Sequence, residues 1–269
     1  MATRKFLFIT ATLIMAGCAA TTQSPRPIDQ LPMYGGMDRS AIPELHEADQ
    51  QFIEDVSEAF GSRKQASRKW TDYGIRKFFE GRGHLAMKRC NQAWLLDPRN
   101  VEAYRCFGLV MMNRGATDKA IHNLEKAREL TPESSAILAD LGATYSIHGA
   151  SPDRTDEERK ALYAKSDELH QQAVEIAPNN PHVYEFRALS LRERGKNVAA
   201  WDAIRKVLGL GGSVDRLLFT NILKSLEEEG YEIANATYPL QDEDAVNRQD
   251  ESTDQVSSAS STTTKGSKE

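Results

Sequence analysis

The spacing of apolar residues predicts helices along most of the chain. From residue 44 to 61 the apolar positions recur at helical spacing, at Leu45, Phe52, Ile53, Val56 and Phe60. Pro43 suits the first turn of such a helix and Gly61 suits its end. We therefore expect an N-terminal flanking helix within residues 43–66, and its apolar face needs a neighbour.

After this helix the pattern repeats every 34 residues. Three series share the same offset: Trp70, Tyr104 and Leu138; Gly74, Gly108 and Gly142; and Gly81, Gly115 and Gly149. Beyond the last glycine of these series the interval becomes 46 and then returns to 34, so twelve residues are inserted in the third unit. A period of this length is typical of paired antiparallel helices, and four such units cover residues 67–214.

Two further helices follow from the same pattern. Thr155 and Glu158 form a capping-box pattern, which predicts that the insertion lengthens the second helix of the third unit. Residues 213–230 are expected to form a capping helix that hides the open face of the last unit. Its N-cap would be Ser213, its stop Gly230, and its apolar residues Leu217, Leu218, Ile222, Leu223 and Leu226. The predicted fold is therefore all-α.

The ends of the chain have a different composition. Residues 18–42 are rich in Thr, Ser, Pro and Gly and predict a flexible tether. Residues 239–269 are rich in Asp, Glu, Ser and Thr and have few large apolar side chains, so they predict a disordered tail.

The first residues predict export. Arg4 and Lys5 precede an apolar run over residues 6–16 that is too short to span a bilayer. Residues 1–17 with Cys18 resemble a bacterial lipoprotein signal peptide, in which that cysteine receives the lipid anchor. The alternative is an ordinary secretory signal with Cys18 incidental. Because alanines and no aspartate follow Cys18, the resemblance implies the periplasmic face of an outer membrane.

The repeated units resemble the tetratricopeptide repeat (TPR). The second unit carries the resemblance most fully, with Tyr104, Phe107, Gly108, Ala120 and Pro132 at the places that the repeat requires. The resemblance implies a solenoid of helical hairpins, with a concave groove lined by the first helix of each unit. Its groove positions correspond here to Ile75, Phe78, Phe79, Arg105, Leu109, Met112, Asn113, Ile147, Glu185 and Arg192.

These groove positions favour an apolar partner. Thr71, Ile75 and Ala139 stand where some TPR proteins place the lysine or asparagine that clamps a peptide carboxylate. We therefore expect an apolar peptide or an amphipathic helix in the groove, anchored by Phe78, Phe79 and Met112. The alternative is that the two phenylalanines pack against the flanking helix.

Other chemistry is disfavoured. The chain has 34 basic and 39 acidic side chains, with a net charge of -5, so it offers no overall basic footprint for nucleic acid. The six histidines are scattered, and no phosphate-binding loop or nucleophile motif is present, so we expect no metal, cofactor or enzymatic activity. Cys90 and Cys106 are interpreted as two small buried residues, although an exporting pathway would permit a disulfide.

Together these features predict a membrane-anchored adaptor that binds proteins in a bacterial cell-envelope assembly. The resembling lipoproteins serve pilus or secretin assembly, or dock cell-wall enzymes. The alternative is a structural homo-oligomer of the envelope.

Overall fold

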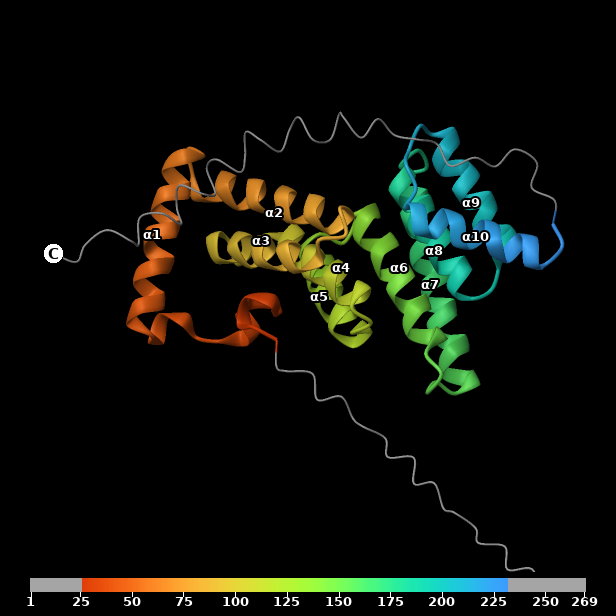
Figure 1. Cartoon of the computed structure of the whole chain (residues 1–269), viewed down its shortest axis with the longest axis horizontal. Coiled ribbons are helices and arrows are strands. Elements are labelled where there is room, and N and C mark those ends of the chain that lie inside the picture. The colour runs from red at the N-terminus through yellow and green to blue at the C-terminus, as the bar shows by residue number, and fades with distance from the viewer. Residues whose placement is uncertain (1–25, 232–269) are drawn as a thin grey trace, which may run out of the picture.

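The computed structural model describes residues 26–231, and Figure 1 shows that this range is helical. Within it, three short 3-10 helices precede ten α-helices. The 3-10 helices are η1 (Ile28–Gln30), η2 (Pro32–Gly36) and η3 (Arg39–Ala41). The α-helices are α1 (Pro43–Ala59), α2 (Arg63–Phe79), α3 (Gly83–Leu96), α4 (Val101–Asn113), α5 (Thr117–Leu130), α6 (Ser135–Ala150), α7 (Asp156–Ile176), α8 (Pro181–Glu193), α9 (Asn197–Gly209) and α10 (Arg216–Glu228).

The α-helices form four consecutive hairpins, α2 with α3, α4 with α5, α6 with α7, and α8 with α9 (Figure 1). The all-α solenoid predicted from the 34-residue period is therefore confirmed. The capping box predicted at Thr155 and Glu158 is also confirmed, because each side chain bonds the other residue's backbone N–H. The capping box lies at the start of α7, which has 21 residues, whereas α3 and α5 have 14 residues each. The second helix of the third unit is therefore longer, as predicted.

The repeated glycines mark where the two helices of a hairpin touch. A β-carbon on Gly108 would collide with Leu124 of α5, and one on Gly142 would lie 2.8 Å from Nε2 of His170 on α7. Close packing leaves no room for such an atom. The spacing of 34 residues is thus imposed by the repeated close approach of one helix to the next.

The last unit is closed by α10. Its buried residues are Leu218, Phe219, Ile222 and Leu226, which pack with α9 residues such as Ile204. Its N-cap is Asp215, whose carboxylate accepts the backbone N–H of Leu218, so the helix begins later than residue 213. Leu217, assigned to the apolar face from sequence, instead has 68% of its surface exposed.

Part of the predicted tether is ordered against the first unit. We call residues 28–41 the N-terminal strap. The buried side chain of Asn91 on α3 donates to the carbonyl oxygens of Asp29 and Leu31, both at 2.9 Å, and accepts the N–H of Tyr34 at 3.3 Å. A flexible tether over all of residues 18–42 is therefore wrong for the strap, because one buried amide satisfies three of its backbone groups.

The flanking helix is shorter than predicted. α1 ends at Ala59, and Gly61, with φ of +77°, reverses the chain direction so that Ser62 caps the start of α2. Residues 63–66, which the sequence placed in the flanking helix, belong instead to the first hairpin.

Several predictions concern residues that the structure does not describe. They are the signal peptide over residues 1–17, the lipid anchor at Cys18 and the tail over residues 239–269. Within residues 26–231, no helix combines the length and the apolar character needed to cross a bilayer.

Candidate functional site

The concave side of the array holds a groove of about 510 Å³. It is lined by the C-terminal ends of α2 and α4, by α8 and by the start of α10, and Figure 1 shows α2 running toward the half of the molecule that holds α8 and α10. A volume of this size lies within the range of sites that bind small ligands or several side chains of a peptide.

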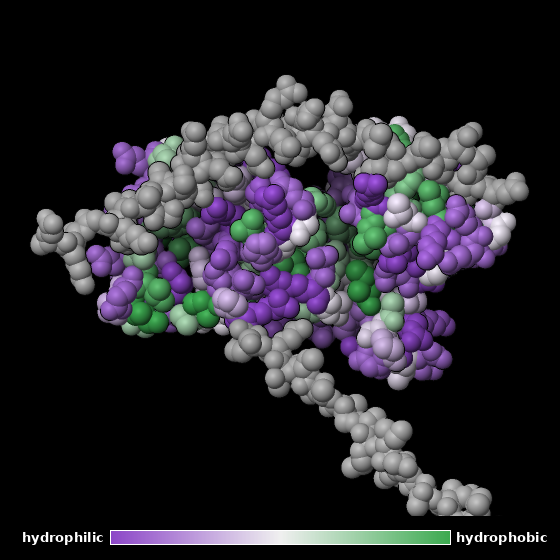
Figure 2. Space-filling model, in the orientation of Figure 1, coloured by the Kyte–Doolittle hydropathy of each residue, from purple (hydrophilic) through white to green (hydrophobic). Residues whose placement is uncertain are grey.

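Two exposed apolar side chains from different helices line this groove. Phe79, at the end of α2, has 53% of its surface exposed, and Leu217, in the first turn of α10, has 68%. Met112, Phe186 and Leu189 also line the groove. Figure 2 shows hydrophobic residues gathered between the two ends of the array, where these helices meet.

Six of the ten sequence-predicted residues line the groove: Phe78, Phe79, Met112, Asn113, Glu185 and Arg192. The other four lie elsewhere. Leu109 is fully buried, and Ile75 and Ile147 pack against the main core. Contrary to the prediction, Leu109 supports the groove from within and leaves no surface for a partner, whereas Ile75 and Ile147 are half-buried and lie outside the groove lining.

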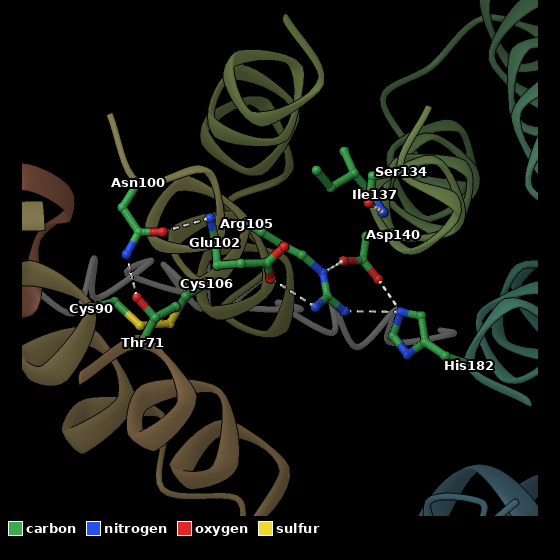
Figure 3. Close-up of polar contacts among 10 residues, drawn as sticks. All are labelled: Thr71, Cys90, Asn100, Glu102, Arg105, Cys106, Ser134, Ile137, Asp140 and His182. Atoms are coloured by element: carbon green, nitrogen blue, oxygen red, sulfur yellow. Dashed lines mark hydrogen bonds and ion pairs between the residues drawn. A yellow bond between two sulfur atoms is a disulfide. The ribbon is translucent and has the colours of Figure 1, made fainter. Parts of the chain in front are cut away.

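Arg105, the fourth of these residues, is buried in an ion network that joins three units (Figure 3). Its Nε lies 2.6 Å from Oδ2 of Asp140, and its Nη1 lies 3.2 Å from Oε2 of Glu102. Nε2 of His182, on α8, lies 2.8 Å from Oδ1 of Asp140. The network thus connects α4, α6 and α8.

The pKa values in this network follow from burial and charge. Burial alone would raise the pKa of Asp140, but the charges of Arg105 and His182 and their hydrogen bonds bring it below its ordinary value. Burial opposes the charge on Arg105, yet the neighbouring carboxylates raise the pKa of its guanidinium. Asp140 and Arg105 therefore stay charged in the folded protein at neutral pH.

The network borders the groove through His182. The ring of His182 lies 4.3 Å from that of Phe186 and 6.5 Å from that of Phe79, measured between ring centroids. Because Phe79 belongs to the first unit and His182 to the fourth, this contact spans the concave side of the array. Side chains of the first and fourth units thus approach each other beside the groove.

The flanking helix does not cover the phenylalanines. The apolar residues of α1 pack against the first half of α2, where the rings of Phe52 and Trp70 lie 6.0 Å apart. Phe78 instead packs against the main core and the ring of Phe79, at 5.2 Å. The alternative in which α1 buries these two residues is therefore wrong.

The contribution of α10 was not predicted. Asp215, Leu217, Leu218 and Asn221 line the groove, together with Phe186 of α8. The signal available in the sequence was the width of the apolar stripe on α10, since six large apolar residues among the ten positions 217–226 exceed what one buried face needs.

A disulfide joins Cys90 of α3 to Cys106 of α4, with their Cα atoms 6.2 Å apart (Figure 3). The sequence-based interpretation of two unlinked small residues is wrong, because consecutive units bring these helices within bonding range. Among residues 26–231, no group of three His, Cys, Asp or Glu side chains could hold a metal ion.

The comparison with known structures agrees with this architecture. The crystal structure of a thermophilic TPR protein from Thermus thermophilus matches with a TM-score of 0.52 at 16% identity, covering 61% of this chain and 83% of that chain. The chain has the fold of a tetratricopeptide-repeat solenoid. At this identity the likeness concerns the fold alone.

Sequence comparisons also find similar proteins, one of them a tetratricopeptide repeat protein. This chain is 32% identical over 173 residues to Tetratricopeptide repeat protein 14 of Mus musculus, covering 59% of this chain and 22% of that protein. It is 31% identical over 75 residues to the Photosystem I assembly protein Ycf3 of Rippkaea orientalis, covering 27% of this chain and 43% of that protein. The chain therefore spans less than half the length of either relative. No protein-family model matches it.

Proposed function

We propose that this TPR solenoid is a membrane-anchored adaptor that binds a segment of another protein in its groove, within a bacterial cell-envelope assembly. The observation that carries the proposal is the pair of exposed apolar side chains, Phe79 of α2 and Leu217 of α10, that line one preformed groove. Exposed apolar surface at a concave site is typical of binding surfaces.

Two observations support the envelope location. The buried disulfide between Cys90 and Cys106 is typical of proteins that fold outside the reducing cytosol. The lipoprotein-like sequence at residues 1–18 supplies an anchor at Cys18, which would hold the chain at the periplasmic face of the outer membrane. A role in assembly agrees with the name of the Ycf3 relative, an assembly protein for photosystem I.

Photo-crosslinking in the native cell tests the binding role. A photoreactive phenylalanine analogue is placed at position 79 or 217, and for the control at Val198, which is 44% exposed on α9 and does not line the groove. We expect the two groove positions, and not the control, to yield an adduct with another protein. Equal adducts from Val198, or none from the groove, would contradict the proposal, and adducts to its own copies would support the homo-oligomer instead.

The anchor is tested separately by cell fractionation of a Cys18→Ser variant. We expect the unchanged chain to fractionate with the outer membrane and the variant to appear in the soluble periplasmic fraction. A variant that stays with the membrane would contradict lipid anchoring at Cys18.

A further inference from the structure

The polar residues of the groove are not electrically balanced. Four charged side chains line it: Glu80, Arg192, Glu185 and Asp215. The first two are neutralised locally, because Glu80 lies 3.0 Å from Nζ of Lys77 and Arg192 lies 2.5 Å from Glu193.

The other two carboxylates, Glu185 and Asp215, differ in this respect. Among residues 26–231, neither forms an ion pair with a lysine or arginine side chain. The groove therefore presents two carboxylates without a lysine or arginine partner beside its apolar walls.

Hydrogen bonds hold both carboxylates in place. Oε1 of Glu185 accepts the backbone N–H of Asp215 at 2.8 Å. Oδ1 of Asp215 accepts the backbone N–H of Leu218 at 2.8 Å and so caps α10. The two acidic side chains thus lie together at the junction of α8 and α10, next to Leu217.

Burial raises the pKa of Glu185, although the hydrogen bond from Asp215 and the proximity of His182 oppose the rise. A raised pKa means that the charged carboxylate is less stable here than in water. A cation brought by a ligand would restore that stability, because opposite charges a few ångströms apart favour the ionised form.

We propose that the groove selects a cationic apolar segment of its partner, in which apolar side chains lie between Phe79 and Leu217 and a lysine or arginine pairs with Glu185 and Asp215. This inference rests on the proposed function and adds the chemistry of the partner. Arginine fits best, since its planar guanidinium can bond two carboxylate oxygens at once.

The same charges disfavour the chain's own tail as the occupant. Residues 239–269 contain seven acidic and three basic side chains, so the tail carries the same sign of charge as the groove. Like charges brought together at an interface oppose association. The complementary occupant is therefore a basic segment of a different protein.

Selection from a library of random 14-residue peptides displayed on phage tests the inference. The target is the full chain in lipid nanodiscs, and peptides are scored as groove-dependent when they fail to bind a Phe79→Ser, Leu217→Ser variant. We expect these peptides to be enriched in apolar residues and in lysine or arginine relative to the unselected library.

The decisive variant is Glu185→Gln with Asp215→Asn, which removes both charges and keeps both hydrogen-bond acceptors, since asparagine also caps helices well. We expect it to bind the selected basic peptides about tenfold more weakly, which corresponds to about 1.4 kcal/mol. The matched control is Glu227→Gln with Glu228→Gln, which removes two exposed charges from the far end of α10 and should leave binding unchanged.

The outcomes separate this inference from the proposed function. Groove-dependent peptides without an excess of cations, or unchanged affinity in the Glu185→Gln, Asp215→Asn variant, would overturn the cationic partner and leave the binding role intact. Failure to recover any groove-dependent peptide would contradict both. Tighter binding after deletion of residues 232–269 would show that the tail competes for the groove, which would overturn the choice of occupant.

Discussion

His170 makes the stability of the solenoid sensitive to acid. Its ring lies between α7 and Gly142 of α6, is 3% exposed, and has no hydrogen-bond partner for either nitrogen among the described residues. Burial, with the nearby charges of Arg187 and Arg194, lowers its pKa from 6.5 to about 3, and Asp140 opposes this only in part. The imidazole is therefore neutral in the folded protein under any mildly acidic condition.

The magnitude follows from proton linkage. In the unfolded chain the imidazole has its ordinary pKa near 6.5, so below that pH the unfolded state binds a proton that the folded state does not. The free energy of unfolding then falls by about 1.4 kcal/mol for each pH unit, until the pH approaches the folded pKa of about 3. Between pH 7 and pH 5, His170 alone should lower the stability by about 2 kcal/mol.

Urea unfolding followed by circular dichroism at pH 7, 6 and 5 measures this effect. Leucine has a similar volume and cannot titrate. Between pH 7 and pH 5, the free energy of unfolding of the His170→Leu variant should therefore decrease by about 2 kcal/mol less than that of the unchanged chain. His84→Leu, at an exposed position on α3, is the matched control and should follow the unchanged chain. Parallel pH curves for the unchanged chain and His170→Leu would refute the reasoning.

Three further perturbations test the packing. Gly108→Ala should lower the free energy of unfolding by about 1–3 kcal/mol because its methyl group collides with α5, whereas Gly209→Ala, with open space around it, should not. Reduction of the Cys90–Cys106 disulfide should lower the free energy of unfolding by about 3 kcal/mol, as expected for a loop of this length. Dithiothreitol should have no effect on the stability of a Cys90→Ser, Cys106→Ser variant, which has no disulfide to reduce. Asp140→Asn should lower the free energy of unfolding by about 3 kcal/mol because it breaks the buried ion pair with Arg105. Urea midpoints at pH 7 measure all three, and unchanged midpoints would contradict them.

The fold was predictable because its constraints are local and repeated. Gly74, Gly108 and Gly142 each occupy a point where a side chain would collide with the paired helix, so the period appears directly in the sequence. The strap was not predictable in this way. Its order depends on Asn91, which lies about 60 residues further along the chain, and composition carries no information about such a partner.

The groove was predicted only in part because its shape depends on how tightly the units stack. The hydroxyl oxygens of Ser146 on α6 and Ser190 on α8 lie 2.6 Å apart, so the third and fourth units pack closely. The start of α10 lines the groove, and Leu109 lies beneath the surface. The shape of the groove depends on the packing at several interfaces between units. A position-by-position comparison with a single repeat carries no information about these interfaces.

The disulfide also has a mechanical consequence. The membrane-anchored adaptor that we propose would be pulled along its chain whenever the membrane and the partner move apart. Because Cys90 and Cys106 are covalently joined, any tension between the strap and the groove helices α8 and α10 crosses from α3 to α4 through the sulfur atoms. The turn over residues 97–100, which would otherwise be the first connection between units to bear that load, lies inside the closed loop and is bypassed.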